Sequence, residues 1–195
     1  MEIKIFKEYL SGLAQLSQQS ETNLFSRMKT LHLDKGAQIL FPGEMCRNLY
    51  FITEGFFRIY SYASGQDITV EFFGPGSLMT SLESFYNRRR GNEGIVCEQP
   101  GKLLQFNYYD WRALEDQSPD FLFLSNAILK QNLLRKNQEV SQLRGGSSKQ
   151  NFLELQRRFP QINRLVSQKH IASYLGISEP TMSGILKDLL FQRNY

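Results

Sequence analysis

Cysteine and histidine are both scarce in this chain of 195 residues. There are two cysteines, Cys46 and Cys97, and two histidines, His32 and His170. Two cysteines cannot form a disulfide framework, and neither lies in a Cys-x-x-Cys pair, so zinc-finger and iron–sulfur sites lack their ligands. The composition therefore predicts no metal site and no cofactor.

The same scarcity argues against catalysis. A jelly-roll enzyme such as a cupin needs two or three histidines and a carboxylate around a metal. The two histidines here lie on either side of a β-rich region. A Ser-His-Asp or Cys-His set would have to use His32, and no Gly-x-x-x-x-Gly-Lys loop is present for nucleotide phosphates. We predict no enzymatic activity and no catalytic residue.

Long apolar runs are also missing. No window approaches 18 uninterrupted apolar residues, and the first residues mix charged and apolar side chains instead of forming a signal sequence. The 6 prolines and 14 glycines are too few for a disordered or fibrous chain, and 13% aromatic residues indicate packed interiors. The expectation is a reduced, cytoplasmic, globular protein that does not enter a membrane.

Charge is unevenly distributed along the chain. Residues 1–129 contain 12 Lys or Arg and 15 Asp or Glu, a balance of −3, whereas residues 130–195 contain 11 and 4, a balance of +7. A basic segment of this kind favours an anionic partner. The acidic front and the basic tail are therefore expected to bind different partners.

The first two thirds of the chain change from helical to β-rich patterns. Residues 1–30 have apolar residues at three- and four-residue steps, which predicts helices, with Ser20 and Thr22 as candidate N-caps. Residues 31–110 alternate short apolar runs with glycine-containing turns, which is typical of a β-sandwich, barrel or jelly roll. The turns are Lys35-Gly36, Pro42-Gly43, Glu54-Gly55, Ser64-Gly65 and Pro75-Gly76, and the predicted strands are 38–41, 49–52, 56–62, 68–73, 95–97 and 103–106.

A long helical pattern follows. Ser118-Pro119-Asp120 opens a segment without glycine before Gly145, and its apolar residues recur at helical spacing. A long, one-sided helix usually packs along a partner, often its own copy, which predicts a homodimer through residues 118–144. A surface helix on the β domain is the alternative. The sequence Gly145-Gly146-Ser147-Ser148 resembles a hinge.

The most specific signal is the segment 167–187. Ser167 can cap a helix with Ile171, Ala172 and Leu175 on its inner face, Gly176 permits a sharp turn, and Ser178 can cap a second helix with Pro180 in its first turn. Short spacing and the small Ala172 predict a helix-turn-helix, whose second helix enters the major groove of DNA. An ordinary helical hairpin is the alternative.

This geometry predicts which residues contact double-stranded DNA. Short polar side chains and a lysine at the helix starts suit phosphates, and the exposed face of the second helix suits base edges. The predicted DNA-binding residues are Ser167, Gln168, Lys169, Ser178, Glu179, Thr181, Ser183 and Lys187. Arg157, Arg158 and Arg164 are expected to add salt-sensitive, non-specific binding.

The order of these patterns resembles the Crp–Fnr family of bacterial transcription regulators. Ile39-Leu40-Phe41-x-Gly43-Glu44, Leu49-Tyr50-Phe51-Ile52-x-x-Gly55 and Phe72-Phe73-x-x-Gly76 are similar to its β-roll turns, and Tyr174-Leu175-Gly176-Ile177-Ser178 to its DNA-binding end. The resemblance implies a homodimer on a two-fold-symmetric DNA site. It implies an α+β fold: an antiparallel, jelly-roll-like β-roll with flanking helices (1–116), a dimerisation helix (117–144) and a helix-turn-helix domain (145–195).

The nucleotide cassette of the family is altered here. Cyclic-nucleotide-binding members have a Gly-Glu pair followed by an Arg beside Ser or Thr, whereas this chain has Thr80-Ser81 and Gly91-Asn92. Binding of cyclic AMP is therefore not expected, and any effector is an unknown small molecule. The candidate effector-pocket residues are Leu78, Met79, Thr80, Ser81, Arg90 and Asn92. The run Arg88-Arg89-Arg90 is either an anion site or a solvated loop.

The DNA-binding end also departs from the family. Where members often have Arg-Glu and a second Arg in the recognition helix, this chain has Glu179-Pro180 and Gly184. Bidentate contact to guanine is lost, so the family's target sequence does not carry over. The sequence stops at Tyr195, where members usually continue into a β-hairpin wing, so a full wing is not expected. The alternative function is a dimeric ligand-sensing or protein-interaction module whose helix-turn-helix has lost DNA binding.

Overall fold

The computed structural model describes residues 2–63 and 65–193. Two short helices come first, α1 (Glu2–Ser11) and α2 (Gln18–Ser26). Ser17 caps α2, so the prediction of Ser20 or Thr22 as the cap is wrong, since both lie inside the helix. The predicted helical region also ends earlier than expected, because β1 (Lys29–Leu33) begins before residue 31.

The centre of the molecule is an antiparallel sheet of six strands within the described residues. Two long strands, β3 (Asn48–Ala63) and β6 (Glu93–Asn107), form its middle in the order β1-β6-β3-β4, with β4 (Gln66–Phe73) at one end. The short strands β2 (Gln38–Leu40) and β5 (Leu78–Met79) pair with β6 and β3. The β-roll prediction is confirmed.

The expected turn at Glu54-Gly55 is instead an irregular stretch within β3, where the pairing with β6 shifts. Gly55 has φ +92°, a backbone conformation that side chains disfavour. A Cβ at this position would lie 2.5 Å from the Cα of Gly101, so glycine is required by space as well as by conformation. The bulge keeps strands 49–52 and 56–62 in one continuous element.

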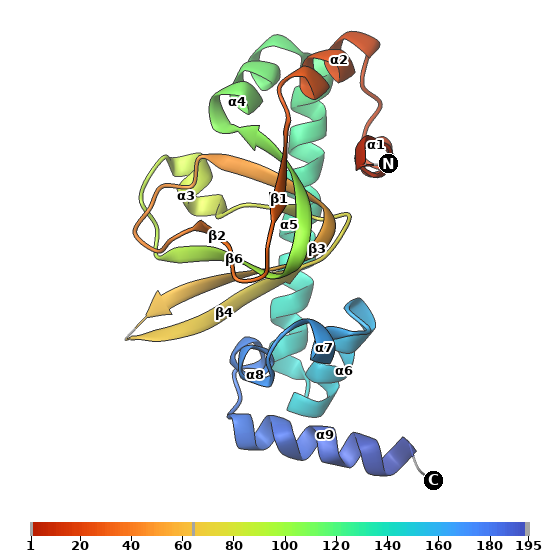
Figure 1. Cartoon of the computed structure of the whole chain (residues 1–195). Helices are drawn as coiled ribbons and strands as arrows, with labels where there is room; N and C mark the ends of the chain where they lie inside the picture. Colours follow the sequence, from red (N-terminus) through yellow and green to blue (C-terminus); the bar gives the residue numbers. More distant parts are fainter. Residues whose placement is uncertain (1, 64, 194–195) are drawn as a thin grey trace.

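Helices cover the sheet and extend from it (Figure 1). The short α3 (Leu82–Asn87) follows β5, α4 (Tyr108–Gln117) follows β6, and α5 (Pro119–Gly145) runs as one long helix past the sheet. The main core lies between α1, the sheet, α4 and the first half of α5, where Phe6, Phe51, Trp111 and Phe121 are at most 1% exposed. Cys97 is fully buried in this core, as predicted.

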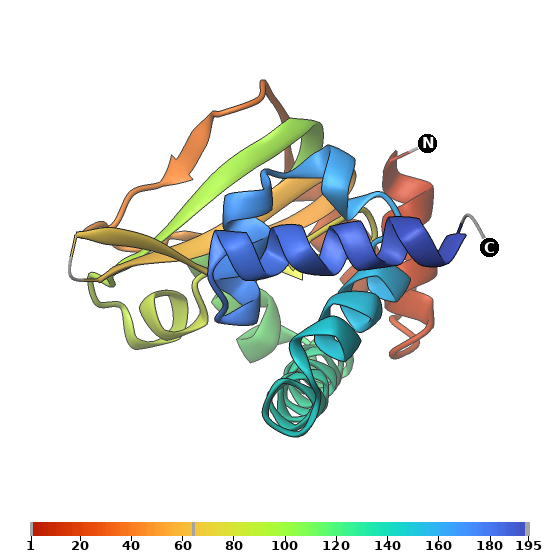
Figure 2. The same ribbon diagram turned by 90° about the horizontal axis from the view of Figure 1, so that it is seen from below.

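Within the described residues, four helices follow α5 and form the C-terminal part of the basic tail. They are α6 (Ser148–Arg158), α7 (Ile162–Leu165), α8 (Gln168–Leu175) and α9 (Glu179–Arg193). Their core is a second cluster that includes Phe152, Ile171 and Met182, and it is continuous with Phe56 and Phe72 of the sheet. The tail is therefore packed against the β-roll, and α9 lies at the end of the molecule farthest from α2 and α4 (Figures 1 and 2).

No helix among residues 2–63 and 65–193 is long and apolar enough to cross a membrane. Within the same residues, no cluster of three His, Cys, Asp or Glu side chains has the arrangement of a metal site. The breaks between α4 and α5 and between α5 and α6 fall near residues 118 and 146. The division of the chain into domains at 116 and 144 stays a prediction.

Candidate DNA-binding surface and effector cavity

The helix-turn-helix is built by local signals. The Ser167 side chain accepts a hydrogen bond from the backbone N–H of His170 and caps α8. Gly176 ends α8 with φ +67°, and the Ser178 side chain accepts from the backbone N–H of Thr181 at 3.2 Å, which starts α9. Gln168 Nε2 donates to the carbonyl of Glu179 at 3.4 Å and joins the two helices at their starts.

Most of the predicted DNA-binding residues lie on the open side of this motif. Ser167, Lys169, Ser178, Glu179, Thr181 and Lys187 are exposed, whereas Gln168 and Ser183 are half-buried. Ala172 is 1% exposed and Met182 fully buried, so the inner faces are those predicted. The exposed residues lie at the starts of α8 and α9 and along α9, the helix nearest the viewer in Figure 2.

The arginines of α6 have partners within the protein. Arg157 forms an ion pair with Glu154, and Arg158 forms ion pairs with Glu139 of α5 and with Glu71 of β4. The expectation that Arg158 contributes to non-specific DNA binding is therefore replaced by a role in joining parts of the chain. Arg164 is exposed at α7, so it remains a candidate for phosphate contact.

Two hollows lie where the β-roll meets α5. The larger, of about 570 Å³, is open and lies between residues 73–78 and the second half of α5. The smaller is a cavity of about 40 Å³, and Leu49, Phe73, Leu78, Trp111 and Ile128 contribute to its walls. A cavity of this size has room for about one water molecule, so a nucleotide does not fit in it.

The candidate effector-pocket residues do not converge. Leu78 and Thr80 border the small cavity, and Met79 is fully buried in the core. Ser81 Oγ donates to Glu93 Oε2 at 2.5 Å, and Thr80 Oγ1 donates to the carbonyl of Asn48 at 2.9 Å, so both hydroxyls are already bonded.

The arginine and asparagine of the altered cassette lie elsewhere. Arg90 pairs as an isolated bridge with Met45 and lines a different hollow, of about 450 Å³, together with Leu40, Cys46 and Asn48. The carbonyl of Asn92 accepts from the backbone N–H of Tyr62 at 3.1 Å, and its side chain is exposed. The structure thus separates Arg90 and Asn92 from Leu78 and Thr80.

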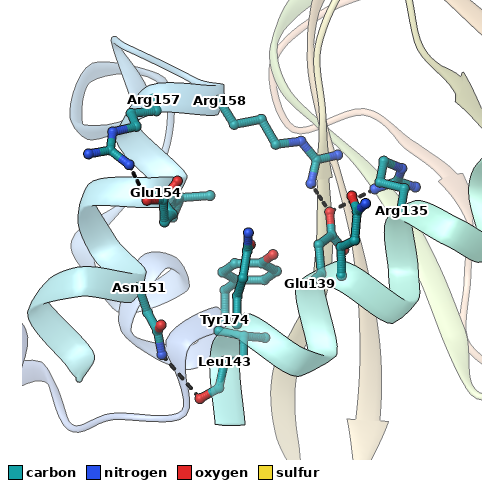
Figure 3. A pocket seen from close by; sticks show the side chains of 11 residues that line it. Arg135, Glu139, Leu143, Asn151, Glu154, Arg157, Arg158 and Tyr174 are labelled. Carbon is teal, nitrogen blue, oxygen red and sulfur yellow. Dashed lines mark hydrogen bonds and ion pairs between the residues drawn. The ribbon is translucent and has the colours of Figure 1, made fainter. Parts of the chain in front are cut away.

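A charged cluster joins β4, α5 and α6, and Figure 3 shows its α5–α6 part, in which Glu139 pairs with Arg135 and Arg158. The Glu71 carboxylate, 4% exposed, forms ion pairs with Arg135 and Lys136 of α5 and with Arg158 of α6. Glu139 pairs with the same three cations. Burial lowers the pKa of Arg135, but Glu71 and Glu139 outweigh this effect and raise it. The buried carboxylate of Glu71 on the sheet therefore binds both α5 and α6, the helices on either side of the segment 145–148.

A second charged cluster joins the sheet to α8. Arg58 donates through Nε to Glu98 at 2.6 Å and through both terminal nitrogens to Asp67. His170 Nδ1 lies 3.2 Å from the same Glu98 oxygen. Burial alone would raise the pKa of Glu98, but the nearby His170 and Arg58 outweigh it, so the pKa is lowered. The prediction that His170 is a surface helix residue is wrong, because its side chain lies between α8 and the sheet, next to Glu98 of β6.

Sequence reasoning missed this contact between the sheet and the helix-turn-helix. Gln99 Nε2 also donates to the carbonyl of Leu165 at 2.6 Å, and Phe72 lies against Tyr174 with ring centroids 5.3 Å apart. The sequence of β4 does contain one signal of this contact. A strand with one face in solvent is expected to alternate apolar and polar residues. The neighbouring apolar pair Phe72-Phe73 breaks that alternation and indicates a strand covered on both faces.

Comparison with known proteins supports the fold assigned above. Residues 30–118 match the family model of the cyclic nucleotide-binding domain. The global regulator CLP of Xanthomonas campestris is 16% identical over 90% of this chain and 93% of its own, with a TM-score of 0.69. FixK2 of Bradyrhizobium japonicum is 17% identical over 85% of each chain, with a TM-score of 0.71. No curated protein sequence matches the chain.

Another similar structure carries a family description. A transcriptional regulator described as Crp/Fnr family, from Eubacterium rectale, is 16% identical over 91% of this chain and 85% of its own, with a TM-score of 0.71. The similarity extends through the helical tail, since these coverages exceed the β-roll. The predicted resemblance is confirmed in the order and fold of the elements.

Proposed function

Because the chain carries a cyclic nucleotide-binding domain within the fold of the Crp/Fnr transcription regulators, we propose that it is a sequence-specific, DNA-binding transcription regulator that does not respond to cyclic AMP. The observation that carries the proposal is the exposed helix-turn-helix surface at the end of the molecule. Its helix starts are capped, its inner face is buried, and its outer face is exposed. This arrangement suits the major groove.

Independence from cyclic AMP is supported by the nearly filled cavity that Leu78 and Thr80 border. The side chains that surround the 40 Å³ cavity are mostly apolar, and the hydroxyls of Thr80 and Ser81 are bonded within the protein. The clusters around Glu71 and Glu98 hold α6 and α8 against the sheet. We propose that these contacts set the relative placement of the sheet and the recognition helix.

We propose a homodimer formed through α5. Leu122, Leu133 and Val140 are 43%, 62% and 43% exposed and, with half-buried Leu129, they recur along one side of the helix at steps of about seven and four residues. Apolar side chains in such a row are stabilised by packing against an equivalent helix. Two recognition helices in one dimer would meet the two halves of a symmetric DNA site.

Two measurements test the proposal. The full chain is mixed with a pool of random duplexes at about 50 mM salt, and bound duplexes are amplified and sequenced; a symmetric consensus is expected, and no enrichment would refute DNA binding. Trp111 is the only tryptophan in the sequence and borders the 40 Å³ cavity, so its fluorescence reports whether a ligand enters that cavity. Millimolar cyclic AMP should leave both the fluorescence and the DNA affinity unchanged, and a saturable change in either would refute effector independence.

The alternative, a dimeric interaction module without DNA binding, is favoured by one observation. Glu179 places an exposed carboxylate in the first turn of α9, where it would face the phosphates of DNA. The selection experiment separates the two functions. A stable dimer in sedimentation that enriches no duplex at low salt would support the interaction module.

A further inference from the structure

The outer face of α9 is poor in hydrogen-bond donors over its first two turns. Pro180, Thr181 and Gly184 are exposed there, and positions 180 and 184 lie one above the other on one helix face. Among the described residues of that face, a lysine first follows at Lys187, in the third turn. The start of a recognition helix is the part that contacts base edges in the major groove. These three residues therefore determine which chemical groups α9 presents to the bases.

The three residues offer little polar surface. Proline has no backbone N–H and an entirely hydrocarbon ring. The Thr181 hydroxyl lies 2.8 Å from Ser178 Oγ in the cap of α9, so its methyl group is the part left for a ligand. Gly184 has no side chain, and a Cβ added there would meet nothing within 4 Å, so the space before it is open.

A surface of this chemistry matches one feature of the major groove. Guanine and adenine are recognised there by donors and acceptors, and Arg or Asn usually supplies them. Thymine alone presents a methyl group, and side-chain methyls and other apolar groups contact it. The open space at Gly184 lets the helix backbone approach closely enough for Pro180 and Thr181 to reach that methyl group.

We propose that α9 selects its DNA by apolar contact with thymine methyl groups, through Pro180 and Thr181, and that Gly184 provides the close approach. The proposal rests on the proposed function, since it specifies how the same surface recognises DNA. Glu179 can only accept hydrogen bonds, which excludes guanine O6 and N7 as its partners. The target half-site is therefore expected to contain thymines that lie against the start of α9.

The test uses deoxyuridine, which differs from thymidine only by the missing methyl group. Duplexes enriched by the full chain are remade with one thymine at a time replaced by uracil, and affinities are measured by fluorescence anisotropy. One or two positions in each half-site should lose about fourfold in affinity, the effect of removing one buried methyl-sized group. Equal affinity for thymine and uracil duplexes at every position would overturn the proposal.

Two variants assign the effect to the helix. Pro180→Ala removes most of the ring and should reduce the uracil effect below about twofold, whereas Asp188→Ala, also exposed on α9 but farther from its start, should leave it unchanged. Gly184→Arg supplies the missing donor and should shift selection toward guanine. Circular dichroism verifies that each variant is folded. An unchanged uracil effect in Pro180→Ala overturns the assignment, and failure to enrich any duplex refutes DNA binding itself.

Discussion

Ser173 of α8 accepts a hydrogen bond from the backbone N–H of Thr69 in β4, with 3.0 Å between nitrogen and oxygen. β4 is the last strand of the sheet in its hydrogen-bonded order, so this N–H would otherwise be an unpaired group at a sheet edge. The first helix of the helix-turn-helix therefore closes the edge of the β-roll. The same helix positions α9, which links the sheet directly to the candidate DNA-binding surface.

Replacing Ser173 by alanine should loosen this link. Thr69 is 4% exposed, so its N–H would lose its partner in a buried place, which costs about 1–3 kcal/mol. Hydrogen exchange followed by mass spectrometry should show faster exchange in β4 and α8 and unchanged exchange in β3. Ser141→Ala, on the exposed side of α5, is the matched control. Equal protection of β4 in the two variants would contradict the edge-closing role.

Glu71→Gln should separate the unfolding of the tail from that of the β-roll. The substitution removes the charge that balances Arg135, Lys136 and Arg158, and we expect a loss of about 2–3 kcal/mol, reduced from the fully buried case because the cations are partly exposed. Calorimetry should then show the tail melting first. Glu154→Gln removes an exposed ion pair with Arg157 and should change stability by less than about 0.5 kcal/mol. A single unshifted transition in Glu71→Gln would count against the role of this cluster.

Glu98 should make stability depend on pH in the acid range. Its pKa is lowered in the folded chain by His170 and Arg58, so its stabilising contribution is present above the unfolded value of about 4.3 and is lost as pH falls through the lower folded value. Urea unfolding between pH 6 and pH 3 should show a smaller decline in Glu98→Gln than in the parent chain. Parallel declines in the two proteins would contradict the proposed contact.

The helix-turn-helix and most turns of the β-roll were predictable because their signals are local. A capping serine, a glycine with positive φ and an inner face at helical spacing lie within 20 or so residues, and each constrains the backbone where it occurs. Ser167, Gly176 and Ser178 have the predicted roles in the structure. The order of such local signals was also enough to identify the fold.

The contacts between the two parts were not predictable from the same signals. Glu71, Glu98 and His170 come from segments far apart in the chain, and each reads locally as a solvated side chain. The separation of Arg90 from Thr80 was not predictable either, because the two residues line different hollows in the folded chain. From their spacing in the sequence, both were predicted to line one effector pocket. In the structure Thr80 borders the small cavity, and Arg90 lines another hollow.

Lys169 provides the most direct test of phosphate contact. It is exposed at the start of α8, next to the cap Ser167, and the starts of helices are where phosphates are held. Lys169→Ala should weaken binding to every enriched duplex by a similar factor. It should also reduce the slope of the logarithm of affinity against the logarithm of salt concentration by about 1 for each phosphate contact removed. Lys4→Ala, whose side chain is 81% exposed on α1, removes the same charge far from α9 and should leave the slope unchanged. A loss confined to some sequences would mean that Lys169 contacts bases, and an unchanged slope would mean that DNA does not reach the start of α8.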